Sequence, residues 1–239
     1  MTLSNAAPAV TPRQRVLKPE QIQAVFEVFQ GIEPEPKGEL DYVNAYTLVV
    51  AVALSAQATD VSVNAATRAL FAKVTTPQQM LDLGEAALKE HIKTIGLYNA
   101  KAANVMKAAQ ILVDDFGGEV PEDRAALESL PGVGRKTANV VLQMYWGHPT
   151  IAVDTHVFRV SNRMGMAAGN NPDQVEDGLN RRVPAAFKNH AHHWLILHGR
   201  YLCKARKPEC WRCPVSEWCC FREQTAEPAP NKPKKQASQ

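Results

Sequence analysis

A glycine-punctuated turn at residues 130–139, with the sequence LPGVGRKTAN, constrains this chain more than any other stretch. One helical pattern, residues 122–129, precedes the turn, and a second follows it over residues 135–146. Glycine adopts backbone angles that are closed to other residues, and it leaves neighbouring amide N–H groups uncovered. Those amides would stand at the amino end of a helix, where free donors and the helix dipole favour a phosphate. The pattern predicts a helical hairpin that can hold a nucleic-acid backbone, although an ordinary helix–turn–helix corner has the same glycines.

Helical periodicity recurs along the rest of the chain, and no stretch of four or more residues alternates convincingly in the manner of a strand. Residues 42–53 are apolar nearly all round, which predicts a helix buried within a core. Residues 76–79, Thr-Pro-Gln-Gln, have the form of a capping box with proline at the first helical position. We therefore predict an all-α fold of about ten helices.

The 239 residues, 45% hydrophobic and 21% charged, suffice for one large or two modest domains. The longest apolar run, roughly residues 48–54, is too short to cross a bilayer, and the amino terminus has no apolar segment of the secretory kind. We therefore expect a cytoplasmic protein with no membrane partner. The net charge of +3 is mildly basic and permits a polyanionic partner without demanding one. The composition of residues 1–17 and of the basic segment 223–239 predicts disordered tails.

All five cysteines lie between Cys203 and Cys220, which is unlike a disulfide framework spread over a secreted domain. Four of them, Cys203, Cys210, Cys213 and Cys219, have six, two and five residues between successive members. Four thiolates so spaced can close on one metal centre, and either zinc or a cubane iron–sulfur cluster would accept them. Cys220 could replace its neighbour Cys219, since the chemistry alone does not choose between them. We favour a structural staple because the segment has few apolar residues.

Several separate segments, taken together with the four cysteines, resemble the endonuclease III family of the helix-hairpin-helix superfamily, whose members are DNA glycosylases and abasic-site lyases. The matching segments are residues 54–61, 95–102, 130–140, 150–160 and 193–200. The resemblance covers roughly residues 19–222, so that only the two tails fall outside it.

The resemblance implies two α-helical domains that flank a DNA-binding cleft. A six-helix barrel domain would span residues 38–147 and contain the hairpin at residues 122–146. An iron–sulfur cluster domain would combine residues 18–37 with residues 148–222. The family also implies a 4Fe–4S cluster instead of zinc, with the first four cysteines as ligands and the fifth as the spare.

By the same resemblance, Lys136 and Asp154 would face each other from opposite walls of the cleft. The family chemistry uses an amine that attacks C1′ of the damaged nucleotide and forms a Schiff base, from which β-elimination follows. Lys136 matches that amine. Asp154 stands where a helix should start, and as a capping carboxylate it would be a fixed anion beside a developing oxocarbenium charge more than a general base. The expected function is base-excision repair: removal of oxidised pyrimidines and cleavage of the resulting abasic site.

Further expected site residues surround this pair. Phosphate contacts are expected from the hairpin and from a basic residue between the cysteines, namely Gly132, Val133, Gly134, Arg135 and Lys207. Two residues would, by resemblance, insert into the DNA stack when the base leaves it: Gln57 and Leu97. Three polar residues would support the catalytic pair: Ser55, Asp60 and His156. The expected partner is double-stranded DNA with damaged pyrimidines or abasic sites, bound by a monomer and, in a bacterium, at the nucleoid.

Two other functions compete with this one. An adenine-removing sister glycosylase shares the hairpin, the aspartate and the cluster. It lacks a lysine at the position of Lys136 and carries a catalytic glutamate where this chain has Ala53, which argues against it. A non-catalytic, zinc-stapled DNA-binding module would use the same hairpin and cysteines without the chemistry. Iron content and covalent trapping on DNA would separate that alternative from an enzyme.

Overall fold

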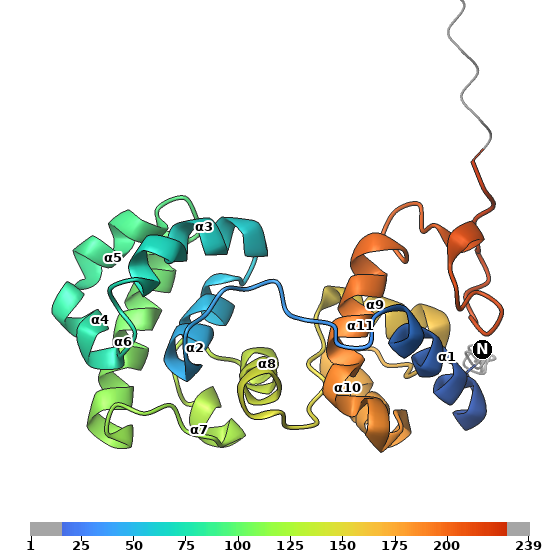
Figure 1. Cartoon of the computed structure of the whole chain (residues 1–239), viewed down its shortest axis with the longest axis horizontal. Helices are drawn as coiled ribbons and strands as arrows, with labels where there is room; N and C mark the ends of the chain where they lie inside the picture. The colour runs from blue at the N-terminus through green and yellow to red at the C-terminus, as the bar shows by residue number, and fades with distance from the viewer. Residues whose placement is uncertain (1–15, 229–239) are drawn as a thin grey trace, which may run out of the picture.

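The computed structural model describes residues 16–228, and within this range the chain is helical, with eleven α-helices, two 3-10 helices and no strand. The predicted all-α fold is confirmed (Figure 1). The helices are α1 (Pro19–Ile32), α2 (Ala45–Leu54), α3 (Asp60–Phe71), α4 (Pro77–Leu83), α5 (Glu85–Ile92), α6 (Tyr98–Phe116), α7 (Arg124–Glu128), α8 (Arg135–Trp146), α9 (Thr155–Met164), α10 (Pro172–Arg182), η1 (Ala185–Phe187), α11 (Lys188–Tyr201) and η2 (Cys210–Arg212). None of the helices in this part of the chain has the length and apolar character that a membrane crossing requires.

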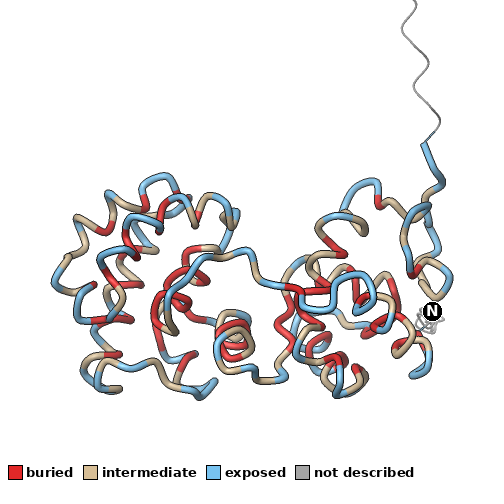
Figure 2. The backbone as a smooth tube through the Cα atoms, viewed as in Figure 1, coloured by how far each residue is buried: buried red, intermediate tan, exposed pale blue. Residues whose placement is uncertain are grey.

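Buried apolar side chains form two hydrophobic cores. The first core draws on residues between 46 and 152, from α2 to α8 and the segment that follows α8. The second draws on residues 17–29 and on residues between 151 and 215, from α1, α9, α10 and α11. We call these parts the first lobe and the second lobe. They lie side by side, each with its own buried interior, and the chain passes from the second lobe into the first and back again (Figures 1 and 2).

Helix α2 lies at the centre of the first lobe because its side chains are apolar on every side. All of its residues except Ala45 and Ala53 are buried, as the sequence predicted for residues 42–53. Helix α2 begins at Ala45, after the start of the predicted range, because the Asn44 side chain accepts the Thr47 N–H and caps the helix there. Helix α2 packs against α8, and this contact fixes the helix that follows the glycine turn.

Local capping chemistry sets several other helix ends. The predicted capping box is confirmed, since the Gln79 N–H donates to the Thr76 hydroxyl and the Thr76 N–H donates back to the Gln79 side chain. In the hairpin, the first helix is shorter than its pattern indicated, because Asp123 caps α7 and confines it to five residues. The second hairpin helix, α8, has the predicted bounds.

The two predicted tails are shorter than the composition suggested. Leu17 is buried in the second core, and its N–H donates to the Gly165 carbonyl at 2.9 Å. At the other end, the Thr225 hydroxyl accepts the Cys210 N–H and donates to the Pro208 carbonyl. The prediction of disorder is therefore wrong for Leu17 and for the residues around Thr225. The remaining parts of the predicted tails, residues 1–15 and 229–239, lie outside the described residues.

Candidate active site and metal centre

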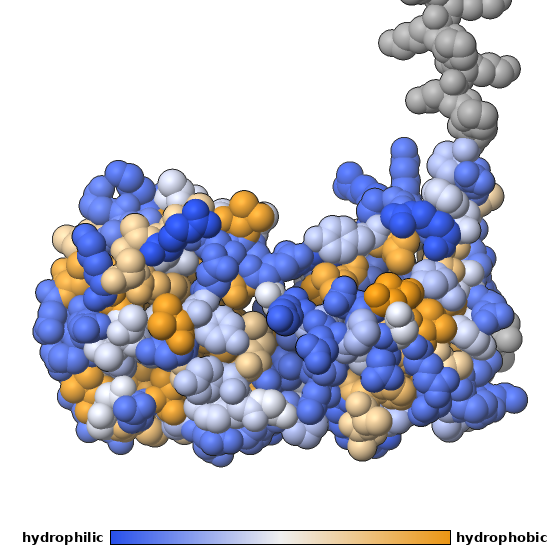
Figure 3. All heavy atoms as spheres, viewed as in Figure 1, coloured by the Kyte–Doolittle hydropathy of each residue, from blue (hydrophilic) through white to orange (hydrophobic). Residues whose placement is uncertain are grey.

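Lys136 and Asp154, the predicted catalytic pair, line one cavity of about 560 Å³ between the two lobes. Lys136 comes from α8 in the first lobe, and Asp154 caps α9 in the second. Ser55 and Asp60 line the same cavity. The space-filling view shows the outline of the molecule drawn in between the lobes (Figure 3). The structure thus brings together four predicted site residues that are far apart in the sequence.

The glycine turn places Lys136 at the exposed amino end of α8. Gly132 has a φ of +84°, and a Cβ at this position would lie 3.2 Å from the Cβ of Asn104, so the turn requires glycine here. Gly134 caps α8 and provides no side-chain hydrogen bond. The first-turn amides of α8 therefore have no side-chain cap, and the positive end of the helix suits an anion.

Asp154 is the predicted helix cap, and this expectation is confirmed. Its Oδ1 accepts the backbone N–H groups of His156 and Val157, each at 2.8 Å. These two bonds fix the orientation of a half-buried carboxylate. With Oδ1 engaged by the backbone, the second oxygen can face a charge in the cavity.

His192, for which no role was expected from the sequence, is buried and lines the same cavity. Its Nδ1 lies 2.8 Å from the Ala152 carbonyl, so the ring N–H donates a hydrogen bond to this oxygen. This bond holds the segment that leads to Asp154. Burial, with His193 and Lys136 nearby, lowers the pKa of His192 to about 3 in spite of Asp154. Burial also lowers the pKa of His193 to about 4. Both rings are therefore neutral at neutral pH.

Arg200 of α11 joins the lobes at another wall of the cavity. Its Nη2 lies 3.0 Å from Oδ2 of Asp60, and its Nη1 pairs with Glu39. The carboxylate of Asp60 is therefore already engaged by a cation. This arrangement supports the shape of the cavity and leaves the Asp154 carboxylate unshared by Arg200.

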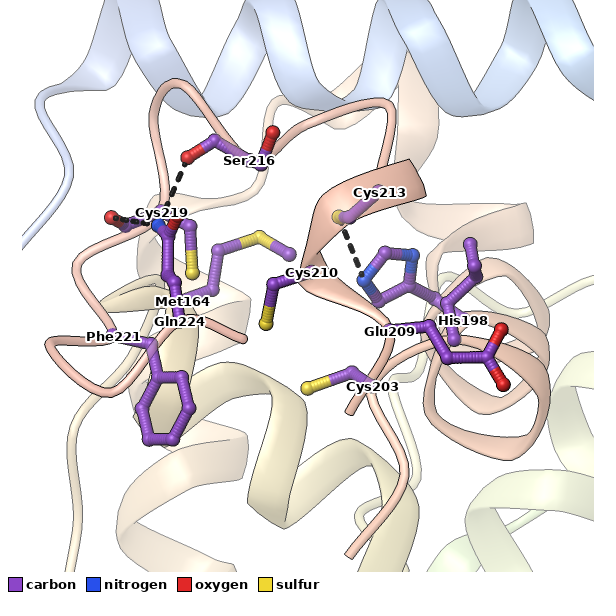
Figure 4. A pocket seen from close by; sticks show the side chains of 11 residues that line it. Met164, His198, Cys203, Glu209, Cys210, Cys213, Ser216, Cys219, Phe221 and Gln224 are labelled. Carbon is purple, nitrogen blue, oxygen red and sulfur yellow. Dashed lines mark hydrogen bonds between the residues drawn. The ribbon is translucent and has the colours of Figure 1, made fainter. Parts of the chain in front are cut away.

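Four of the five cysteines line a second cavity, of about 370 Å³, in the second lobe. Figure 4 shows the sulfur atoms of Cys203 and Cys210 turned toward the same space, while the thiol of Cys213 lies beside His198. Cys219 also lines this cavity, and Cys220 does not. Four thiols around one space are the donor set that a metal–sulfur centre requires.

The surroundings suit a metal centre held by thiolates. Two arginines of α9 donate to the backbone of the cysteine loop: Arg159 to the Cys203 carbonyl at 2.9 Å, and Arg163 to the Lys204 carbonyl at 2.7 Å. Burial raises the pKa of the Cys219 thiol to about 11. This shift opposes the thiolate form, whereas Nη1 of Arg163, 3.7 Å from the sulfur of Cys203, favours a thiolate there.

Comparison with known sequences decides the family. The sequence model for HhH-GPD superfamily base excision DNA repair proteins matches residues 50–185, and that for the iron–sulfur binding domain of endonuclease III matches residues 203–219. Endonuclease III of Escherichia coli K12 is 58% identical over 190 residues, which cover 80% of this chain and 90% of that protein. Endonuclease III of Rickettsia conorii is 56% identical over 200 residues, which cover 84% and 95%.

The chain belongs to the endonuclease III family. A solved structure described as a trapped endonuclease III–DNA covalent intermediate matches it with a TM-score of 0.81 and 42% identity, over 85% of this chain and 96% of that one. A thermostable thymine-DNA glycosylase, at 24% identity and a TM-score of 0.76, shares the fold.

Membership of the endonuclease III family makes this chain a base-excision repair DNA glycosylase and abasic-site lyase with a 4Fe–4S cluster. The two alternatives, an adenine-removing enzyme and a zinc-stapled module without catalysis, are therefore wrong. When bound, the cluster supplies iron–sulfur bonds that cross-link a loop with little apolar core of its own.

Two of the residues expected to contact phosphate, Val133 and Arg135, make contacts within the protein. The Val133 N–H donates to the Leu130 carbonyl at 3.0 Å, and its side chain is buried in the first core, so Val133 anchors the turn instead. The Arg135 guanidinium lies against Glu176, with Nε 3.0 Å from Oε2 and Nη2 3.1 Å from Oε1. In the free protein both groups are thus engaged within the chain, and their contacts with a DNA phosphate stay a prediction.

His156 lies behind the cavity and is not part of its lining. Its Nδ1 is 3.2 Å from Nη2 of Arg159, and its Cβ packs where a side chain on Gly199 would stand. His156 thus helps α9 pack against α11. The sequence offered one signal for the missed residue His192: two adjacent histidines directly before the apolar run at residues 194–197.

Proposed function

We propose that Lys136 supplies the nucleophilic amine, and Asp154 the fixed anion, of the glycosylase and lyase reactions. The observation that carries this proposal is that the two side chains, one from each lobe, line the same cavity. A nucleotide turned out of the duplex could present its C1′ to both groups at once. One family relative has been trapped as a covalent intermediate with DNA, which also supports an enzyme nucleophile.

In the proposed reaction, the deprotonated Nζ of Lys136 forms a bond to C1′. The bond between C1′ and the base nitrogen breaks, and its electron pair leaves with the base, which takes up a proton. Nitrogen then loses a proton as the sugar ring opens, which gives a Schiff base between Lys136 and C1′. Removal of a proton from C2′ expels the 3′ phosphate by β-elimination, and water releases the sugar fragment from the lysine.

Asp154 contributes an anion beside the positive charge that develops at C1′. Its two bonds to the backbone of α9 hold the carboxylate before the substrate arrives. A charge that is already oriented stabilises the transition state without reorganisation. Ser55 and Asp60 assist indirectly: the Ser55 hydroxyl donates to the Val52 carbonyl at 2.9 Å, and Asp60 pairs with Arg200.

Backbone strain supports the assignment of the DNA-inserting residues. Among the described residues, the non-glycine residues with positive φ are Gln57, Leu97 and Lys207. A positive φ costs a bulky residue about 1–3 kcal/mol, and such strain persists mainly at functional sites. Leu97 is also 64% exposed, which is unusual for a leucine in a well-packed lobe. We infer that Gln57 and Leu97 fill the space of the extruded base and that Lys207 contacts a phosphate.

The substrate is proposed to be double-stranded DNA that contains oxidised pyrimidines or abasic sites. The uncapped amides near Gly132 and Gly134 would hold the backbone at the first lobe, and the loop around Lys207 would hold it at the second. Contacts of this kind position the duplex without reading its sequence.

The cluster is proposed to be held by Cys203, Cys210, Cys213 and Cys219, because these four thiols line one cavity and Cys220 lies outside it. The Cys220 N–H donates to the Met164 carbonyl, which anchors this residue beside the site. We further infer that residues 38–147 form one domain, that residues 18–37 and 148–222 form the other, and that the enzyme acts as a monomer in the cytoplasm, at the nucleoid of a bacterial cell.

Borohydride trapping on an abasic oligonucleotide tests the proposal. Lys136→Gln removes the amine and keeps a side chain of similar reach, so DNA binding should persist while the trapped adduct disappears. Base release and strand cleavage should both fall by orders of magnitude. Lys73→Gln, which removes an exposed lysine elsewhere in the first lobe, is the matched control and should trap normally. A normal adduct yield in Lys136→Gln would sink the assignment.

A further inference from the structure

Glu176 of α10 is a charged side chain buried where the lobes meet. Its side chain is only 5% exposed, and it is buried beside the apolar residues Val175 and Leu179 of the same helix. Its carboxylate receives Nε of Arg135 at 3.0 Å and Nη2 at 3.1 Å, and Nη1 of Arg124 lies 3.8 Å away. A buried carboxylate is tolerated only when it is paired in this way, and the two-pronged arginine contact is the strongest form of pairing.

The pairing joins the two catalytic walls. Arg124 is the first residue of α7 and Arg135 the first residue of α8, so one carboxylate of the second lobe holds both helices of the hairpin. Lys136 follows Arg135 directly. On the other side, α10 packs against α9, the helix that Asp154 caps. Lys136 therefore lies next to one end of this ionic contact, and the other end belongs to the lobe that carries Asp154.

We propose that the Arg135–Glu176 ion pair is a positioning contact that sets the separation of Lys136 and Asp154 across the cavity. The proposal rests on the catalytic roles proposed above. It differs from a phosphate-binding role for Arg135, because the guanidinium already faces Glu176 and has Asp173 and Asp177 at 3.8 and 3.9 Å. A phosphate that approached Arg135 would meet these carboxylates as well, and like charges repel.

The geometry of the contact explains why arginine stands at this position. The planar guanidinium matches both oxygens of a carboxylate and so fixes direction as well as distance, which a lysine ammonium cannot do. Catalysis depends on such placement, since a misplacement of about 1 Å costs on the order of 100-fold in rate. Loss of the contact should therefore slow the chemistry more than it weakens binding.

Single-turnover base release at saturating DNA, measured beside DNA affinity at several salt concentrations, tests the proposal. Glu176→Gln and Arg135→Gln should each slow base release by about 10- to 100-fold. The double variant should be no slower than the slower single one, because both changes break the same contact. Affinity and its salt dependence should stay near those of the unaltered enzyme. Glu20→Gln, which removes an exposed carboxylate from α1 in the same lobe, is the control and should release base at the normal rate.

Arg135→Lys separates the two roles of the arginine. This variant keeps the positive charge at the helix end but loses the two-pronged contact of the guanidinium with Glu176. We therefore expect slow base release with normal affinity for DNA. The same variant also serves if a glutamine variant does not fold, as judged by its thermal melt. Normal base release in Glu176→Gln or in Arg135→Lys would overturn the positioning role. A flatter salt dependence of the DNA affinity in Arg135→Gln would overturn it as well. Borohydride trapping of Lys136→Gln, run in parallel, separates the two proposals. A trapped adduct in Lys136→Gln would refute Lys136 as the nucleophile. If no adduct forms there and Glu176→Gln releases base at the normal rate, only the positioning contact is refuted.

Discussion

The glycine turn at residues 130–134 and the cysteine loop at residues 203–219 are both short, irregular segments, but different forces hold them. The turn is anchored by Leu130 and Val133, whose side chains are 2% and 5% exposed in the first core. Of its seventeen residues, the cysteine loop buries two, Pro208 and Val215, and its regular structure is a single 3-10 turn at Cys210–Arg212. Burial therefore shapes the turn, whereas the loop depends on thiols and on hydrogen bonds.

The backbones of the two segments are therefore held in position in different ways. The turn is formed by the folding of the first lobe itself, so its amides are in place whether or not anything binds. The loop is held from outside by Arg159 and Arg163 of α9 and from within by the cluster that its cysteines bind. The proposed catalytic lysine thus stands on a packed helix, whereas the proposed second contact with DNA stands on a loop held by a cofactor.

The largest effect is expected from a substitution that disrupts the cysteine loop and leaves the glycine turn intact. Cys213→Ser should abolish the iron content, lower the melting temperature and weaken DNA binding, because one ligand of the cluster is lost. Cys220→Ser is the matched control and should keep its iron, since Cys220 lies outside the cavity. Iron analysis and visible absorption measure both. Loss of iron in Cys220→Ser with retention in Cys219→Ser would reverse the choice of ligand.

The next effect concerns Asp154, which caps α9 and lines the cavity together with Lys136. Asp154→Asn keeps an oxygen for the helix amides but removes the anion, so base removal should fall by orders of magnitude. Cleavage of a ready-made abasic site needs no glycosidic bond broken and should suffer less. Separate assays on a damaged-base duplex and on an abasic duplex measure the two steps. Equal loss of both activities would mean that Asp154 mainly adjusts Lys136.

Local chemistry made much of this site predictable, and long-range pairing did not. The glycine turn, the Asp154 cap and the set of four cysteines each follow from residues close together in the chain. The Arg135–Glu176 pair joins residues 41 apart, and His192 meets the Ala152 carbonyl across 40. Composition likewise cannot show that Leu17 finds a place in the second core. Such contacts depend on how the lobes pack, which a local pattern does not specify.

Acid should weaken the second lobe selectively, because α11 buries neutral histidines there. Burial lowers the pKa of His193 from 6.5 to about 4, so the folded form binds this proton less readily than the unfolded chain does. Its contribution to stability is present above pH 6.5 and is lost as the pH falls toward 4. At pH 5 the loss should be about 2 kcal/mol, at 1.36 kcal/mol per pH unit. Thermal melts of the unaltered enzyme and of His193→Asn, which lacks the titrating ring, measure it, and parallel pH profiles would contradict the expectation.

The smallest expected effect tests whether the cysteine loop, like the glycine turn, contacts DNA. Lys207 stands in the cysteine loop with a φ of +52°, and its side chain is exposed. If it neutralises one phosphate, Lys207→Ala should weaken binding to all DNA sequences alike and reduce the slope of log affinity against log salt by about 1. Lys207→Gly would relieve the backbone strain and should show the same slope, which separates lost charge from altered loop shape. Affinity for an abasic-analogue duplex over a range of salt concentrations measures both variants. An unchanged slope would remove the cysteine loop from the interface and leave the amides of the glycine turn as the main phosphate contact.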